Sequence, residues 1–245
     1  MTSAISSRPG KLILAVETST SLGSLALLSA DTVIEQTTWE RQGSHSEFVT
    51  AHFCEILRSQ KISAHDIDCI AVGVGPGSFT GIRVAVNFAR ALAFGLKKPV
   101  FTMNSLGLLV HQPSLANHRG HVFVVQYGFR DIFYGAEYYL DQSETIKIVE
   151  VQKPRAITAR DLAAWIPRQS LVIGAGALKL KDSPFQSCLD LWEIRPANNI
   201  LPEAAFFSRT LVAVSKNPPL TDWIHTVPLY IRASEAEEKL RSSAF

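Results

Sequence analysis

Gly75-Pro76-Gly77-Ser78-Phe79-Thr80-Gly81 is the stretch of the sequence that decides the fold. It follows a short apolar run, residues 70–74, which is typical of a buried strand, and it precedes residues 82–95, whose apolar spacing predicts a helix. The stretch therefore predicts a tight glycine loop between a strand and the N-terminus of a helix. Glycine allows positive φ values and close approach of the backbone, and Ser78 or Thr80 can cap the helix.

Such a loop is physically suited to an anion. The first turn of a helix has free N–H groups and carries the positive end of the helix dipole. The loop is not a Walker P-loop, because no Lys-Ser or Lys-Thr follows Gly81. Two interpretations stay open: Gly77, Ser78 and Thr80 contact an anion or a nucleotide, or the loop is only a turn that lets the helix pack on a sheet.

The composition is that of an ordinary globular protein. The chain has 245 residues, of which 47% are hydrophobic and 19% charged, enough for one large domain or two small lobes. A net charge of +2 and a pI of about 8.4 do not indicate a strong binder of polyanions. The three cysteines are widely spaced in apolar surroundings, which favours reduced thiols in a cytosolic protein. We find neither a signal peptide nor an apolar run long enough to span a bilayer, so we expect a cytoplasmic location.

The order of the predicted elements repeats in the two halves of the chain. Residues 1–10 are polar and are predicted to be a flexible tail. Residues 11–115 form the predicted N-terminal lobe, with strands at 12–16, 24–29, 32–39, 69–74 and 100–103 and helices from 46, 82 and 105. Residues 116–245 form the predicted C-terminal lobe, with strands at 122–126, 132–140, 145–151, 171–174 and 189–194 and helices at 158–165 and 204–215. The sequence thus predicts an α/β fold made of a duplicated βββαβαβα lobe.

A duplicated lobe of this kind resembles the two-lobed actin-like ATPase (ASKHA) fold of actin, sugar kinases and chaperone ATPases. Five short motifs make the resemblance more specific. They are Glu17-Thr18-Ser19-Thr20, His45-Ser46-Glu47, GPGSFTGIR at residues 75–83, Asn104-Ser105-Leu106 and Pro228-Leu229-Tyr230-Ile231-Arg232. With these motifs the chain resembles the TsaB (YeaZ) family, strongly in its N-terminal half and loosely in its C-terminal half.

The resemblance implies a non-catalytic scaffold or activating subunit in the formation of threonylcarbamoyladenosine beside the anticodon of tRNA. In that family the paralogue TsaD carries the metal and transfers the threonylcarbamoyl group, and the P-loop ATPase TsaE joins the complex. The implied partners are TsaD and TsaE, with a homodimer when TsaD is absent, contact with tRNA mainly through the complex, and no membrane. We expect no tightly bound cofactor, and ATP or ADP at the interface of the complex stays open.

The residue types at the matching positions favour a scaffold over an enzyme. TsaD-type enzymes are known for a His-x-x-x-His pair on the helix after the fifth strand, but residues 102–109 contain no histidine, and no cysteine pair has zinc spacing. ATPases of the superfold hold magnesium through an acidic group after the first strand of each lobe. Glu17 supplies that group in the first lobe, whereas Tyr127-Gly128-Phe129-Arg130 replaces the family's Asp-Ala-Arg in the second. We therefore predict no metal ligand and no catalytic residue, with Glu17 added to the residues that could contact an anion or nucleotide.

Two enzyme alternatives stay open. One is an ATP-dependent kinase or transferase of the actin-like superfold, motivated by Glu17 and the glycine turns. The other is a hydrolase with Ser78 as nucleophile, although no histidine or aspartate can be assigned to it from spacing.

A partner surface is predicted on the first two helices. Small residues that recur every fourth position share one helix face and let another helix approach closely. They are Gly81, Ala85, Ala89 and Ala93. The alternative is that they pack on this protein's own first helix. The resemblance favours the partner, because the family pairs through these helices, and it adds Phe48, His52 and Ile56 as exposed contacts.

Overall fold

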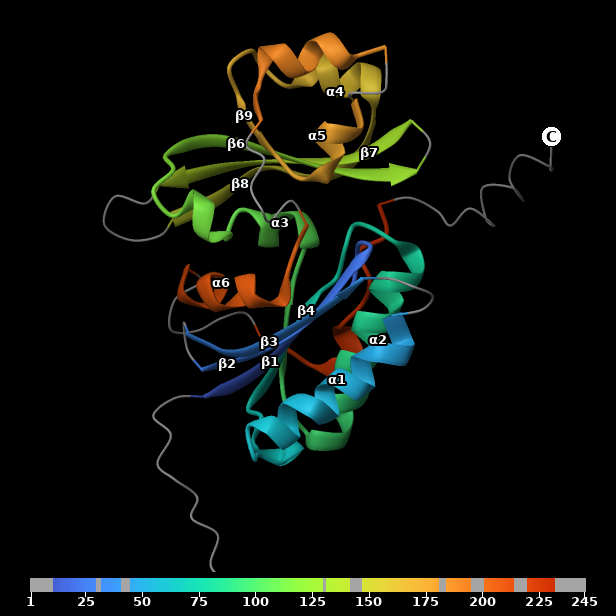
Figure 1. Ribbon diagram of the computed structural model, residues 1–245, viewed down its shortest axis with the longest axis vertical. Helices are drawn as coiled ribbons and strands as arrows, with labels where there is room; N and C mark the ends of the chain where they lie inside the picture. Colours follow the sequence, from blue (N-terminus) through green and yellow to red (C-terminus); the bar gives the residue numbers. More distant parts are fainter. Residues whose placement is uncertain are drawn as a thin grey trace, which may run out of the picture.

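The computed structural model describes residues 11–29, 32–40, 45–129, 131–141, 147–180, 184–194, 201–213 and 220–231 (Figure 1). These residues form two lobes, each built on a mixed β-sheet. The predicted tail, and the arginines Arg130 and Arg232 of the motifs quoted above, lie outside the described residues.

The first lobe follows the predicted order of elements. It contains β1 (Leu12–Glu17), β2 (Leu22–Ser29), β3 (Thr32–Glu40), α1 (His45–Ser59), β4 (Cys69–Gly73), α2 (Phe79–Leu96), β5 (Val100–Met103) and α3 (Ser105–Leu109). The three N-terminal strands are antiparallel neighbours, and β1, β4 and β5 run parallel. The resulting strand order is β5-β4-β1-β2-β3.

The second lobe repeats this arrangement. It contains β6 (Gly120–Phe129), β7 (Ile132–Asp141), β8 (Lys147–Thr158), α4 (Ala159–Trp165), β9 (Leu171–Ile173), α5 (Ala175–Lys179) and β10 (Glu193–Ile194). Its strand order, β10-β9-β6-β7-β8, is the counterpart of the first sheet. The predicted duplicated lobe is therefore confirmed. The short helix α5 was not predicted, because only a glycine turn was expected there.

The C-terminal part of the chain returns to the first lobe. A 3-10 turn (Ala204–Phe206) leads into α6 (Phe207–Ala213), and later β11 (Leu220–Thr221) pairs with β5 at the edge of the first sheet, followed by the 3-10 turn η6 (Trp223–His225). The Ala204 N–H donates to Ser24 Oγ at 2.9 Å, which ties this segment to β2. The prediction that residues 116–245 all belong to the C-terminal lobe is therefore wrong for the end of the chain, because β11 completes the first sheet.

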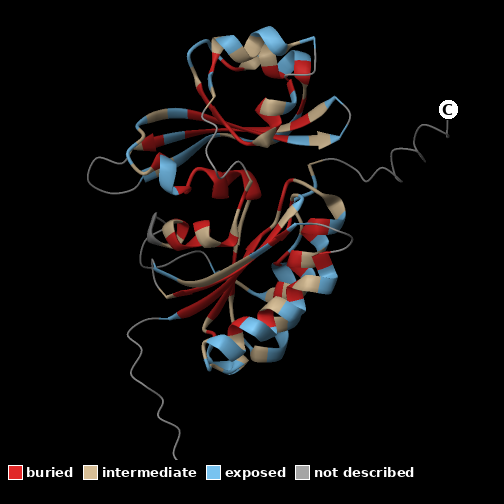
Figure 2. Ribbon diagram, viewed as in Figure 1, coloured by how far each residue is buried: buried red, intermediate tan, exposed pale blue. Residues whose placement is uncertain are grey.

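Helices cover both faces of the first sheet. Helices α1 and α2 lie on one face, and α3 and α6 lie on the other, between the two sheets (Figure 1). Strand β1 is buried along its whole length, as expected for a central strand covered on both sides. Figure 2 shows buried residues along the strands and on the sheet-facing sides of the helices. One apolar cluster runs from Ala15 and Phe101 in the first sheet through Leu106 to Val124 in the second, so the lobes share a core.

Two of the predictions made from the sequence concern helix α2. It is long and apolar enough to cross a membrane by length and composition, so the expectation that no such run exists is wrong. In the fold, however, Ile82 and Val86 pack against the first sheet, as in a core helix of a globular domain. The small-residue face is also internal: it is buried within the first lobe and offers no surface to a partner. Its members are Gly81, Ala85, Ala89 and Ala93.

The burial of that face predicts how substitutions on α2 act. Ala89→Arg is expected to lower the free energy of unfolding by more than about 3 kcal/mol, because it forces bulk and an unpaired charge into a packed core. Ala91→Arg, on the exposed side of the same helix, is expected to change it by less than about 0.5 kcal/mol. Urea unfolding followed by circular dichroism measures both, and equal stability of the two variants would contradict the assignment of faces.

Candidate functional site

The site is organised by the carboxylate of Glu17 at the end of β1. One oxygen accepts a hydrogen bond from the Ser19 N–H at 2.6 Å, and the other accepts from Ser105 Oγ at 2.8 Å. Ser105 lies in α3, and its hydroxyl also accepts from the Gly75 N–H at 3.1 Å. The carboxylate therefore connects β1, the glycine loop and α3 through one chain of hydrogen bonds.

Glu17 is enclosed by protein. Its side chain is fully buried, and a β-carbon on Gly73 would lie 1.8 Å from its Oε2 atom, so the absence of a side chain at Gly73 makes room for it. Burial raises the pKa of Glu17, and the hydrogen bonds from Ser19 and Ser105 offset only part of this rise. A carboxylate in this position cannot face a nucleotide or a solvated magnesium ion. The prediction that Glu17 contacts an anion or nucleotide is therefore wrong.

The glycine loop packs on the β1–β2 hairpin. A β-carbon on Gly77 would lie 2.2 Å from the Ser19 carbonyl oxygen, and one on Gly81 would lie 2.0 Å from the Thr18 carbonyl oxygen. The Ser78 N–H donates to the same Ser19 oxygen at 2.6 Å, and Thr18 Oγ1 donates to the Gly81 carbonyl at 2.7 Å. Glycine is required at both positions because the two backbones approach so closely. This agrees with the interpretation of the loop as a turn that lets the helix pack on the sheet.

Several polar groups of the loop form hydrogen bonds within the protein. Ser78 Oγ caps α2 by accepting from the Gly81 N–H at 3.2 Å, and the N–H groups of Gly75 and Ser78 have partners within the protein. A phosphate cradle would therefore lack these donors. Thr80 is exposed and Gly77 is half-buried, so an anion contact by these two residues stays a prediction.

A C-terminal strap holds the loop from outside; it consists of residues 226–231. The Leu229 N–H donates to the Val74 carbonyl at 2.8 Å, directly before the loop. Tyr230 stacks on Phe79 with 4.9 Å between ring centroids, and Arg83 Nε donates to the Tyr230 hydroxyl at 2.7 Å. The Arg83 guanidinium lies 3.9 Å from the centre of the Phe79 ring. The Pro-x-Tyr-x-Arg motif marked this segment in the sequence, but no local pattern indicated that it closes over the start of α2.

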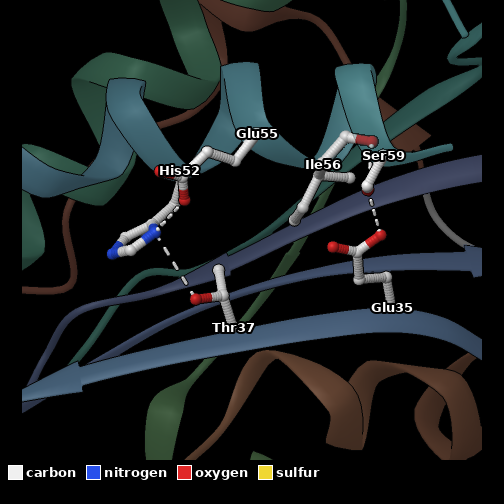
Figure 3. Close-up of polar contacts among 6 residues, drawn as sticks. All are labelled: Glu35, Thr37, His52, Glu55, Ile56 and Ser59. Carbon is white, nitrogen blue, oxygen red and sulfur yellow. Dashed lines mark hydrogen bonds and ion pairs between the residues drawn. The ribbon is translucent and has the colours of Figure 1, made fainter. Parts of the chain in front are cut away.

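The predicted contacts on α1 turn toward the sheet. Ile56 is buried, and His52 stacks on Trp39 of β3 with 4.9 Å between ring centroids. Figure 3 shows the His52 ring directed at Thr37 of β3, with Glu55 beside it at 2.8 Å. Only Phe48 and His52 keep part of their surface accessible. The expectation that Phe48, His52 and Ile56 are exposed together is wrong, because this side of α1 covers β3.

The second lobe repeats the glycine turn without the acid. Gly174 has φ of 98°, and a β-carbon on it would lie 2.4 Å from the Val125 carbonyl oxygen. At the end of β6, Tyr127 and Phe129 are exposed. Within the described ranges, no group of three or more His, Cys, Asp and Glu residues could hold a metal ion.

The duplicated sheets and the paired glycine turns define a two-lobed α/β protein of the actin-like class. A solved structure of YeaZ from Pseudomonas aeruginosa superimposes on the chain with a TM-score of 0.72, at 22% identity, over 90% of this chain and 99% of that one. The shared architecture therefore extends over both lobes.

Sequence relatives make the assignment more specific. A family model described as TsaD, tRNA N6-adenosine threonylcarbamoyltransferase, matches residues 33–158. The Escherichia coli tRNA threonylcarbamoyladenosine biosynthesis protein TsaB is 28% identical over 93% of this chain and 97% of its own length. The protein of the same name from Haemophilus influenzae is 38% identical, but the match spans only 38% of this chain and 39% of that protein. The chain belongs to the family that the TsaD model describes, in its TsaB (YeaZ) branch, which confirms the resemblance seen in the sequence.

The burial of Glu17 predicts a pH dependence of stability. Because its pKa is raised in the folded chain, the folded state binds more protons than the unfolded state at pH values above the ordinary value of 4.5. The free energy of unfolding therefore falls as the pH rises from about 4.5 to the raised pKa. Glu17→Gln cannot ionise, so its stability relative to the unmodified chain is expected to increase from about pH 4 to pH 8. Urea unfolding at a series of pH values measures this, with the exposed Glu40→Gln as control; parallel curves for Glu17→Gln and the unmodified chain would refute it.

The strap predicts a local change in dynamics. Tyr230→Ala removes the ring that contacts Phe79 and Arg83, so we expect the amides of Val74, Gly75 and Leu229 to exchange about tenfold faster with deuterium. Tyr139→Ala, a comparably exposed tyrosine in β7, is the matched control and should leave these amides unchanged. Unchanged exchange in Tyr230→Ala would show that the strap does not hold the loop.

Proposed function

We propose that this chain is a non-catalytic subunit in the formation of threonylcarbamoyladenosine on tRNA, and that it acts by binding TsaD. The names of the TsaB relatives and the match to the TsaD family model support the reaction context. The burial of Glu17 supports a structural role for the residue at which an ATPase of this fold would hold magnesium.

The outer surface of α1 and α2 carries the proposal. Because the sheet-facing sides of both helices are buried, a partner can reach only the opposite sides. Besides the charged Glu47, Arg58 and Arg83, those sides carry a group of uncharged, exposed residues that a partner can contact. They are Thr50, Ala51 and Cys54 on α1 and Thr80 and Asn87 on α2. The half-buried Val84 and Phe88 of α2 pack against the core of the first lobe and are not part of this group. We call this group the outer α1–α2 face.

The places of the other components of the complex follow from the outer α1–α2 face. TsaD occupies the outer α1–α2 face, and a second copy of this chain occupies it when TsaD is absent. TsaE then joins the pair, tRNA enters mainly through the assembled complex, and ATP or ADP is held at the interface between subunits rather than within this chain.

The kinase or transferase alternative is less well supported. Phosphoryl transfer in this superfold requires acidic groups that reach a magnesium ion on the phosphates. Glu17 is enclosed between Gly73 and Ser105, and the matching position in the second lobe offers Tyr127 instead of an acid.

A single substitution on the outer face tests the proposal. Ala51→Arg places bulk and charge on an exposed helix surface, so it should preserve folding but weaken the complex with TsaD at least tenfold. Size exclusion of the mixed proteins at micromolar concentration measures pairing, and threonylcarbamoyladenosine formation by the reconstituted components measures function. Ala164→Arg makes the same change on an exposed position of α4 and should leave both unchanged. If the unmodified chain and TsaD elute separately, the proposal is wrong.

A further inference from the structure

An exposed aromatic pair lies at the C-terminal end of α2. The Phe94 side chain is 64% exposed although it is a large apolar group. Its ring meets Trp223 of η6 edge to face, with centroids 5.0 Å apart and planes at 70°. Trp223 is only half-buried itself. Contact with Trp223 holds the Phe94 side chain at the surface, while most of the Phe94 ring stays exposed to solvent.

Cations flank this pair on both sides. Arg90, Phe94 and Lys97 follow one another at helical spacing and therefore share one side of α2. The Arg90 guanidinium lies 5.7 Å from the centre of the Trp223 ring. Arg90 and Lys97 are separated by about 10 Å along the helix axis, at 1.5 Å per residue, with Phe94 between them.

Two adjoining hollows accompany these side chains. One has a volume of about 290 Å³ and is lined by Arg90, Ala91, Phe94 and Trp223. The other, of about 480 Å³, is lined by Ala93, Phe94, Lys97, Lys98, Pro99, Asp222 and Trp223. Phe94 and Trp223 line both hollows, so each hollow adjoins the aromatic pair. Asp222 and Asp68, which lies 3.9 Å from Lys98, only partly offset the three cations.

Ordinary stabilising roles explain part of this arrangement. Lysines at the end of a helix interact favourably with the helix dipole, and Trp223 fastens the C-terminal segment to α2. Neither role requires the ring of Phe94 to be exposed between cations. An uncovered aromatic face flanked by positive charge is the arrangement with which proteins bind single-stranded nucleic acid, through base stacking and phosphate contacts.

We propose that this surface binds single-stranded RNA, with a base stacked on Phe94 and phosphates on the neighbouring cations. The inference rests on the proposed function, which makes tRNA the relevant RNA, and it extends that function by giving this chain a direct contact with the substrate. The proposed RNA surface lies at the end of α2 and beside η6, which follows β11, the edge strand of the first sheet.

Binding of a short RNA to the full-length chain tests the proposal. The probe is a fluorescent single-stranded RNA of about 12 nucleotides, titrated at several salt concentrations and followed by anisotropy. Phe94→Ala should weaken binding about tenfold through loss of stacking. Lys97→Ala should lower the slope of log K against log salt by about 0.7, as expected for one lost phosphate contact on a single strand. Thermal unfolding of Phe94→Ala should match the unmodified chain, because the side chain is mostly exposed.

Matched controls distinguish binding at this surface from a general effect of any exposed cation or aromatic ring. Arg58→Ala removes an exposed cation of α1, and Phe129→Ala removes an exposed aromatic ring of the second lobe; neither should alter RNA affinity. A duplex of the same sequence should bind more weakly than the single strand, because its bases cannot stack on Phe94.

Two results would overturn the proposal. One is the absence of the expected RNA binding: either the unmodified chain shows no detectable affinity at low salt, or Phe94→Ala leaves the affinity unchanged. The other is loss of the TsaD complex in Phe94→Ala with RNA binding intact, which would make the surface a protein contact. Failure here is distinct from failure of the proposed function, because TsaD pairing and its sensitivity to Ala51→Arg are measured without RNA.

Discussion

A carboxylate removed from water sets the geometry of the first lobe. Glu17 is tolerated inside the fold because two donors bind it and Gly73 leaves room for it, since an unpaired carboxylate at this depth would be strongly destabilising. Through Ser105 the same group reaches the Gly75 amide, so the glycine loop is held against β1. The loop in turn sets the direction of α2. Both the outer α1–α2 face and the aromatic-basic surface at the end of α2 therefore depend on this buried contact.

Comparison of the two lobes separates what the fold needs from what a reaction would need. In both lobes a glycine turn lies close to the backbone of the lobe's first strand or of the turn directly after it: Gly77 at Ser19, after β1, and Gly174 at Val125 of β6. The acidic residue is found in only one lobe, and there it is sealed by hydrogen bonds. Glycine spacing in this protein is thus explained by backbone packing, which the duplicated lobe repeats and which requires no bound phosphate.

Local patterns predicted most of the fold because apolar periodicity and glycine turns are properties of neighbouring residues. The duplicated lobe and the launching of α2 from residues 75–81 were both predictable in this way. The faces of α2 were not: Ala85 and Ala89 suit a close helix contact whether their neighbour is a partner or the protein's own sheet, and only tertiary packing distinguishes the two. The pairing of β11 with β5 could also not be predicted from the sequence, because a two-residue strand has no periodicity and its partner is distant in the chain.

The return of the C-terminal segment has a consequence for biosynthesis. Domains usually fold as units during translation, with N-terminal parts first. Here the first sheet gains its edge strand only when residues 220–221 have been made, and the face under α6 is covered only when residues 204–213 are available. The second lobe can therefore assemble on the ribosome before the first is complete. The lobe that is translated first is the last to be finished, and until then the part of its apolar sheet face under α6 is open to chaperones or to misassociation.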